Sequence, residues 1–105
     1  MIEVPFVRRQ FEVDGEMVEA RFYRPVADRG DYRCDLEIDW PEKTRSKHAF
    51  GVDEVQALLL AMQLAHADLL AAREMDGRQV SYLNDRSLGL PLAKSIADWD
   101  SENRL

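Results

Sequence analysis

One cysteine and two histidines are the residues of this chain best suited to covalent or acid–base chemistry. Cys34 would be a nucleophile if a histidine activated it. A hairpin that turns after Pro41 and sets Leu36 opposite His48 would make Cys34 and His48 diagonal neighbours, about 7 to 8 Å apart, beyond the reach of proton transfer. We therefore expect Cys34 to be a small core residue and assign no catalytic residue. Two histidines and one cysteine also supply too few ligands for a structural zinc site.

His66 is the main candidate for a ligand pocket. It lies within the long apolar stretch Val55–Leu70, on the side that we assign to a sheet. A histidine in that position is usually a core residue hydrogen-bonded to a carbonyl or hydroxyl group. The alternative is a small-ligand pocket between helix and sheet, with His48 or Tyr82 beside His66. A deep concavity converging on His66 would favour the pocket.

Charged residues alternate with apolar ones from Arg33 to Asp39 and raise the question of a metal site. Same-face residues two apart on a strand stand roughly 6.5 to 7 Å apart, whereas Ca²⁺ and Mg²⁺ bind oxygens at about 2 to 2.6 Å. One strand cannot close around an ion, so we expect a solvated ladder of cross-strand charge pairs. The expected pairs are Arg45 with Asp39, Lys47 with Glu37, and Arg21 with Asp35 or Glu37.

The formal net charge of -6 disfavours binding to nucleic acid or to an anionic membrane. A nucleic-acid binder would need its basic residues to gather on one face, namely Arg8, Arg9, Arg21, Arg45 and Lys47. No phosphate-binding loop, dinucleotide fingerprint or GxSxG motif occurs, so no cofactor is expected. The single cysteine, and an N-terminus without an export signal, favour a cytoplasmic protein.

The pattern predicts one α+β domain over residues 1–105. Asp14-Gly15, a type I′ turn dipeptide, predicts strands over about 4–13 and 16–26. Alternation predicts a strand over 32–40 and a weaker edge strand over 44–50, and a fifth is expected over 79–84. We expect an antiparallel β-meander of four to five strands with one long helix across one face. A short helix should begin near Pro91, with Leu92, Ile96 and Trp99 on one side, and a loosely ordered tail from about residue 100.

The long helix should begin at Asp53, an N-cap in a capping-box relation to Gln56, and run to about Glu74 before an αL glycine at Gly77. Its polar interruptions and charged flanks leave the apolar stretch too short for a transmembrane helix of about 20 residues.

This helix has two apolar sides on a helical wheel. We assign the richer side to the sheet: Val52, Val55, Leu58, Leu59, Met62, Ala65, Leu69 and Leu70. The opposite side carries the interface candidates Ala57, Leu60, Ala61, Leu64, Ala67 and Ala71. Either the C-terminal segment or the same helix of a second copy should cover it, unless it is simply exposed.

The segment FGVDEVQALLLAMQLAHADLL, followed by VSYLNDRSLGLPL, resembles a small family of uncharacterised bacterial domains. The family pattern is an aromatic-Gly-Val-Asp start, a QALLLA helix, a short strand and a Leu-Gly-aliphatic-Pro stretch. Here these are residues 50–53, 56–61, 80–83 and 88–91. The resemblance implies a small bacterial cytoplasmic protein and no assigned catalytic residue.

The expected function is therefore a non-catalytic protein–protein interaction module, with another protein or a second copy of itself as partner. The alternative is a ligand-binding protein or enzyme with the helix–sheet pocket near His66.

Overall fold

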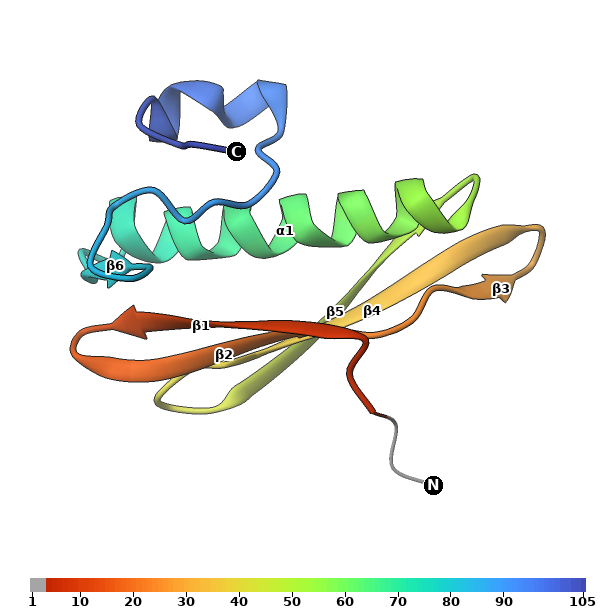
Figure 1. Cartoon of the computed structure of the whole chain (residues 1–105), viewed down its shortest axis with the longest axis horizontal. Helices are drawn as coiled ribbons and strands as arrows, with labels where there is room; N and C mark the ends of the chain where they lie inside the picture. The colour runs from red at the N-terminus through yellow and green to blue at the C-terminus, as the bar shows by residue number, and fades with distance from the viewer. Residues whose placement is uncertain (1–3) are drawn as a thin grey trace.

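The fold is a six-stranded antiparallel sheet with one long helix packed across one face (Figure 1). The computed structural model describes residues 4–105. In chain order the elements are β1 (Val7–Val13), β2 (Glu16–Phe22), β3 (Val26–Asp28), β4 (Asp31–Asp39), β5 (Thr44–Gly51), α1 (Glu54–Glu74), β6 (Val80–Ser81) and the 3-10 helix η1 (Lys94–Asp100). Strand β4 pairs with β5 along one edge and with β2 and β3 along the other, and β2 continues through β1 to β6. The predicted α+β class is confirmed.

The first hairpin forms where the sequence predicts it. Asp14 and Gly15 both have positive φ, 53° and 83°, as a type I′ turn requires at both central positions. Val13 faces Glu16 across this turn, which fixes the register of the whole β1–β2 ladder.

The second predicted strand is divided into β2 and β3 by a short gap that ends in Pro25. Phe22 faces Leu36 before the gap and Val26 faces Arg33 after it, so the register shifts by one residue. Proline has no N–H for the ladder. One extra residue on one strand is a β-bulge, which increases the local twist of the sheet.

The β4–β5 hairpin differs from the predicted register by one residue. Leu36 faces Lys47 and not His48, because the connecting loop, 40–43, is one residue longer than the predicted loop, 41–43. A slip of one residue moves each side chain of a strand to the other face. Lys47 therefore lies on the helix side, where its Nζ is 2.9 Å from Oδ1 of Asp68.

Both ends of α1 form as predicted. The Asp53 carboxylate accepts a hydrogen bond from the Gln56 N–H at 2.8 Å, and the Gln56 side chain accepts one from the Val52 N–H at 2.7 Å. The helix ends at Glu74. Gly77 then has a φ of +67°, the left-handed conformation that favours glycine.

The side of α1 that meets the sheet is lined with alanine. Ala57, Ala61 and Ala65 are completely buried there. The sheet face beneath is bulky: Phe11, Phe22, Leu36, Ile38 and Trp40. Because protein interiors are filled to high density, a bulky sheet face needs a small helix face. The approach is close enough that a Cβ on Gly51 would lie 2.3 Å from the backbone nitrogen of Ala57.

The predicted orientation of α1 is thus partly wrong. Val52, Val55 and Leu59, assigned to the sheet, are 73%, 75% and 42% exposed. The other members of that side are buried or half-buried, as predicted: Leu58, Met62, Ala65, Leu69 and Leu70. Hydrophobicity alone predicts that valine and leucine face the sheet. The bulky side chains of the sheet leave too little space for them, so the small alanine side chains pack there instead.

Strand β6 is shorter than the predicted strand over 79–84. Only Val80 and Ser81 pair with β1. Leu83 and Asn84 have φ of 50° and 63°, so the chain turns immediately and cannot continue an extended strand.

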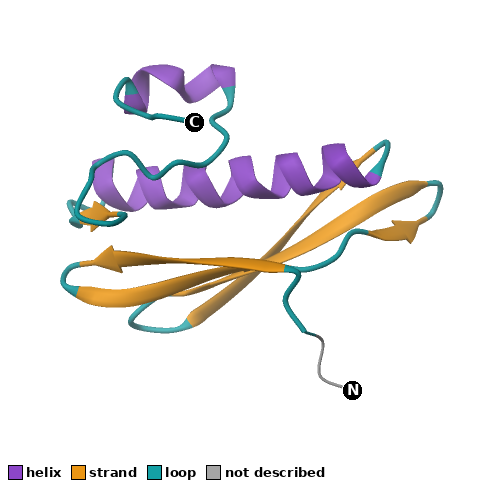
Figure 2. Cartoon of the chain, in the orientation of Figure 1, coloured by secondary structure: helices purple, strands orange, loops and turns teal. Residues whose placement is uncertain are grey.

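The C-terminal segment folds back over the side of α1 that faces away from the sheet (Figures 1 and 2). Leu92 and Ile96 pack against the core, whereas Trp99 is 40% exposed. The residues from 100 onward, expected to be a loose tail, make several hydrogen bonds. Asn103 donates to the Leu90 carbonyl at 3.1 Å, and the Arg104 N–H donates to the Ser87 hydroxyl at 2.8 Å.

Candidate functional site

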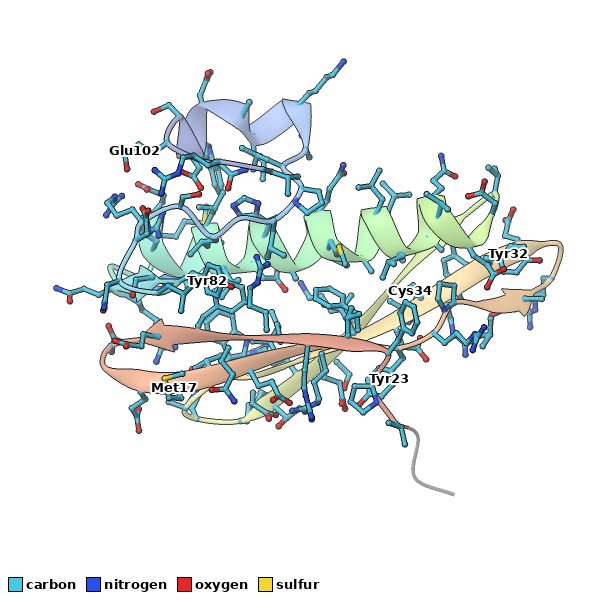
Figure 3. All side chains as sticks on the ribbon, in the orientation of Figure 1. Met17, Tyr23, Tyr32, Cys34, Tyr82 and Glu102 are labelled. Atoms are coloured by element: carbon cyan, nitrogen blue, oxygen red, sulfur yellow. The ribbon has the colours of Figure 1, made fainter. Side chains whose placement is uncertain are left out.

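The three candidate pocket residues lie in three separate places. His66 contacts the C-terminal segment. His48 lies on the open sheet face beside Phe50, with ring centroids 5.3 Å apart. Tyr82 follows β6 and packs against Phe11, with ring centroids 5.7 Å apart; Figure 3 shows it at the β6 end of α1. The main concavities of residues 4–105 are lined by side chains other than His66.

His66 is completely buried and both of its ring nitrogens have partners. Nδ1 lies 3.0 Å from the Pro91 carbonyl oxygen, and Nε2 lies 3.3 Å from Oδ2 of the buried Asp100. A carbonyl only accepts, so Nδ1 carries a hydrogen. His66 therefore joins α1 to η1 and faces away from the sheet, contrary to the prediction.

Cys34 is a core residue, as predicted. Its thiol is buried and donates to the Tyr23 carbonyl at 3.3 Å. Burial, together with the negative charge of Asp35, raises the pKa of Cys34 to about 11. The thiol is therefore protonated at neutral pH and is a poor nucleophile. His48 faces Asp35 and lies on the opposite side of the sheet from Cys34.

The open face of the sheet carries a charge network centred on Arg21. Its guanidinium donates to Asp39 at 2.9 Å, to Glu19 at 3.1 Å and to Glu37 at 3.3 Å. Hydrogen bonds from Arg21 and Thr44 lower the pKa of Asp39 to about 2. The predicted pairing of Arg21 with Glu37 is confirmed. The carboxylates of Glu19, Glu37 and Asp39 are thus paired with the Arg21 side chain, as in a structural charge ladder.

A shallow groove of about 470 Å³ lies beside this network. Its polar side chains are Tyr23, Asp35, Glu37, Ser46 and His48. The Tyr23 hydroxyl donates to Glu37, and this bond raises the pKa of Tyr23 and lowers that of Glu37. Within residues 4–105, no three His, Cys, Asp or Glu side chains are placed to hold a metal ion.

The five basic residues that a nucleic-acid surface would need do not gather on one face. Arg8 faces Arg21 on the open side of the sheet, whereas Arg9 faces Ala20 on the helix side. Arg45 and Lys47 face Ile38 and Leu36, also on the helix side, so neither reaches the carboxylates with which it was predicted to pair.

Two of the predicted interface residues belong to the core. Ala57 and Ala61 have no exposed surface, so they cannot form part of an interface while the domain is folded. The remaining four are half-buried: Leu60, Leu64, Ala67 and Ala71. The hydrogen bonds that join the C-terminal segment to α1 lie at His66, outside this stripe. An interface role for these four residues stays a prediction.

The exposed apolar residues Val52, Val55 and Leu59 form a surface that we name the α1 patch. Val55 and Leu59 lie one turn apart on the side of the helix that carries His66, and Val52 lies just before the N-cap Asp53. The C-terminal segment covers this side of α1 around His66 and leaves its N-terminal half uncovered (Figure 1).

The spacing of the alanines in α1 indicates which side of the helix faces the sheet, and it does so better than hydrophobicity does. Alanines recur at positions 57, 61 and 65, a four-residue spacing that makes one narrow small-residue face. Such a face is typical of close helix packing. If the alanine face is placed against the sheet, Val55 and Leu59 are predicted to face outward.

Helix α1 meets the length and composition of a membrane span, with a mean hydropathy of 1.4 over 18 residues. The expectation that polar residues leave the apolar stretch too short for a membrane span is therefore wrong by the criteria of length and composition. In the structure, α1 packs against the sheet on one side and the C-terminal segment on another, as a core helix does.

A family model described as a domain of unknown function, DUF6968, matches residues 7–92. Because the match spans most of the sequence, the chain belongs to this family. The matched range contains the residues of the helix motif at 50–61 and also β1 to β5, in which the sequence showed nothing recognisable. No curated protein and no solved structure matches the chain.

Proposed function

We propose that this chain is a non-catalytic protein–protein interaction module of the bacterial cytoplasm, and that it forms a homodimer through the α1 patch. The observation that carries the proposal is the exposure of Val55 and Leu59 on a side of α1 that the C-terminal segment covers only farther along, around His66. Single exposed apolar residues are common. Several on one side of one helix indicate a contact surface.

The surroundings of the α1 patch suit a small interface. The patch has Asp53, Glu54 and Gln56 at its margin, all exposed, which gives an apolar centre with a polar rim. A two-fold axis through the patch would set Val55 and Leu59 of one copy against those of the other. This is an isologous contact, the commonest kind. Because the patch is small, we expect a weak dimer that dissociates in the micromolar range.

Sedimentation velocity at low and high micromolar concentration tests the proposal. The wild type should shift from the 12.1 kDa monomer toward twice that mass as concentration rises. Val55→Glu/Leu59→Glu should stay monomeric at every concentration, because it places charge at the centre of the contact.

The matched control is Gln79→Glu/Asn84→Asp, which adds the same charge at two exposed residues outside α1. It should dimerise nearly as the wild type does. Circular dichroism establishes that both variants are folded. A wild type that remains monomeric at high micromolar concentration, or a control that dissociates as fully as the patch variant, would refute the proposal.

A further inference from the structure

Strand β1 is paired along its whole length on one edge and only at one end on the other. It faces β2 from Val7 to Val13, but it faces β6 only at Glu12 and Val13. Between Val7 and Phe11, this second edge has no partner strand within residues 4–105. Figure 1 views the molecule from this edge, with β1 drawn across the front of the sheet.

The hydrogen-bonding groups on the open edge can be assigned from the ladder. Successive residues of an antiparallel strand point their N–H and C=O groups to alternate neighbours. Val13 closes the two-residue hairpin with Glu16, so the odd-numbered residues of β1 bond to β2. The backbone groups of Arg8 and Gln10 then point to the open edge. No backbone hydrogen bond outside the ladders joins either residue to another part of residues 4–105.

A groove of about 530 Å³ runs beside this edge. Its other wall is the turn that contains Tyr82 and Leu83. Arg9 fixes this wall: its guanidinium lies 4.3 Å from the Tyr82 ring centroid and donates to the Leu88 and Gly89 carbonyls, both at 2.9 Å. The groove is therefore formed before any partner binds, which lowers the entropic cost of binding.

The charge along the open edge of β1 indicates which kind of strand can bind there. Arg8 and Arg9 make no ion pair with a carboxylate of the described chain. Glu12 lies at the end that β6 closes. A second copy fits poorly: pairing Arg8 with Gln10 of that copy would set the two Arg9 side chains opposite each other. Centring the pair on Arg8 would oppose the two Arg8 side chains, and like charges directly opposite are destabilising.

We propose that the open edge of β1 accepts an extended acidic segment of another protein as an added β-strand. The backbone groups of Arg8 and Gln10 supply the hydrogen bonds, and Arg8 supplies the charge preference. Exposed Leu83 lines the groove and contacts the apolar side chains of the segment. Strand addition of this kind obtains affinity from the main chain and specificity from alternate side chains.

The test is a titration of the isotope-labelled full chain with a defined peptide, followed by amide NMR shifts. The probe is an acetylated, amidated hexapeptide that alternates glutamate and valine. Its shifts should concentrate between Val7 and Phe11 and in the turn around Leu83. The same peptide with lysine in place of glutamate, and the same peptide with every internal amide N-methylated, should not bind.

Three variants separate the contribution of the Arg8 charge from that of the backbone hydrogen bonds. Arg8→Glu should weaken binding about tenfold, while Arg24→Glu, the same change at an exposed residue between β2 and β3, should leave it unchanged. Gln10→Pro removes one outward N–H without touching the β2 ladder and should abolish binding. If that variant does not fold, the N-methylated peptide tests the same hydrogen bonds.

The proposal is overturned if the glutamate peptide causes no shifts at millimolar concentration, or if the lysine or N-methylated peptide binds equally well. A wild-type dimer whose contact maps to β1 would also overturn it. The peptide outcomes do not bear on the α1 patch, because Val55→Glu/Leu59→Glu should bind the peptide like the wild type. A dimer through β1 would overturn both proposals.

Discussion

Arg21 reaches three carboxylates from one position on the open sheet face: Glu19 on its own strand, and Glu37 and Asp39 on β4. The Asp39 side chain is 39% exposed, so water screens this pair. Its contribution to stability is at most about 1 kcal/mol. A network of this kind orders the side chains of a face that no other element of residues 4–105 covers, and it titrates in acid.

The Arg21–Asp39 pair should make stability depend on pH in the acid range. The pKa of Asp39 is lowered from 3.8 to about 2, so the pair stabilises the fold above the unfolded pKa and loses that contribution as pH falls from about 4 to 2. Arg21→Met should lower the urea midpoint at pH 7 and have less effect near pH 2. Arg24→Met is the control. An equal deficit for Arg21→Met at both pH values would show that the pair carries no such dependence.

At the scale of elements, local signals predicted where α1 and the first hairpin begin and end. Asp53 and Asp14-Gly15 act on their own neighbours, so each could be recognised without knowing the rest of the chain. The rotation of α1 and the β4–β5 register could not be predicted in that way. Val55 turns outward because distant aromatic residues fill the space above the sheet, and Lys47 turns inward because the β4–β5 loop is one residue longer than predicted.

The alanine face of α1 gives the clearest test of this packing. Ala61→Leu adds volume at a position with no exposed surface, so we expect a loss of about 1 to 3 kcal/mol in the free energy of unfolding. Ala67→Leu is the same substitution at a half-buried position and should change that energy by less than about 0.5 kcal/mol. Urea unfolding measures both. A loss at Ala67 as large as that at Ala61 would contradict the assigned rotation of α1.

The C-terminal segment depends on the His66–Asp100 contact. Asp100→Ala leaves a ring nitrogen of buried His66 without a partner, at a cost of about 1 to 3 kcal/mol. Asp100→Asn should cost less, because its amide can donate to neutral His66. Hydrogen exchange should show earlier opening of Pro91 to Asn103 in Asp100→Ala, with β1 and β2 unchanged. Equal exchange in the two variants would indicate that the hydrogen bond at Nε2 does not hold the segment.

Over the whole molecule, the monomer leaves two surfaces of opposite character. The α1 patch is apolar and belongs to a chain with a net charge of -6, so two copies that meet there repel each other at long range. The β1 edge presents Arg8 and Arg9 within the same acidic chain, so an acidic segment is repelled by the molecule and attracted by the site. Salt screens all of these charges, with a Debye length of about 10 Å at 0.1 M and 3 Å at 1 M.

Salt should therefore act in opposite directions on the two contacts. Raising sodium chloride should tighten dimerisation through the α1 patch, because it screens repulsion between acidic copies while the apolar contact is retained. It should weaken binding of the glutamate–valine peptide, because the attraction to Arg8 acts over a short distance and is screened as well. Sedimentation and NMR titration in the same salt series measure the two dissociation constants. If added salt tightens both dimerisation and peptide binding, the charge of Arg8 contributes nothing to recognition at the edge. If added salt weakens both, the dimer contact is held by ion pairs outside the α1 patch.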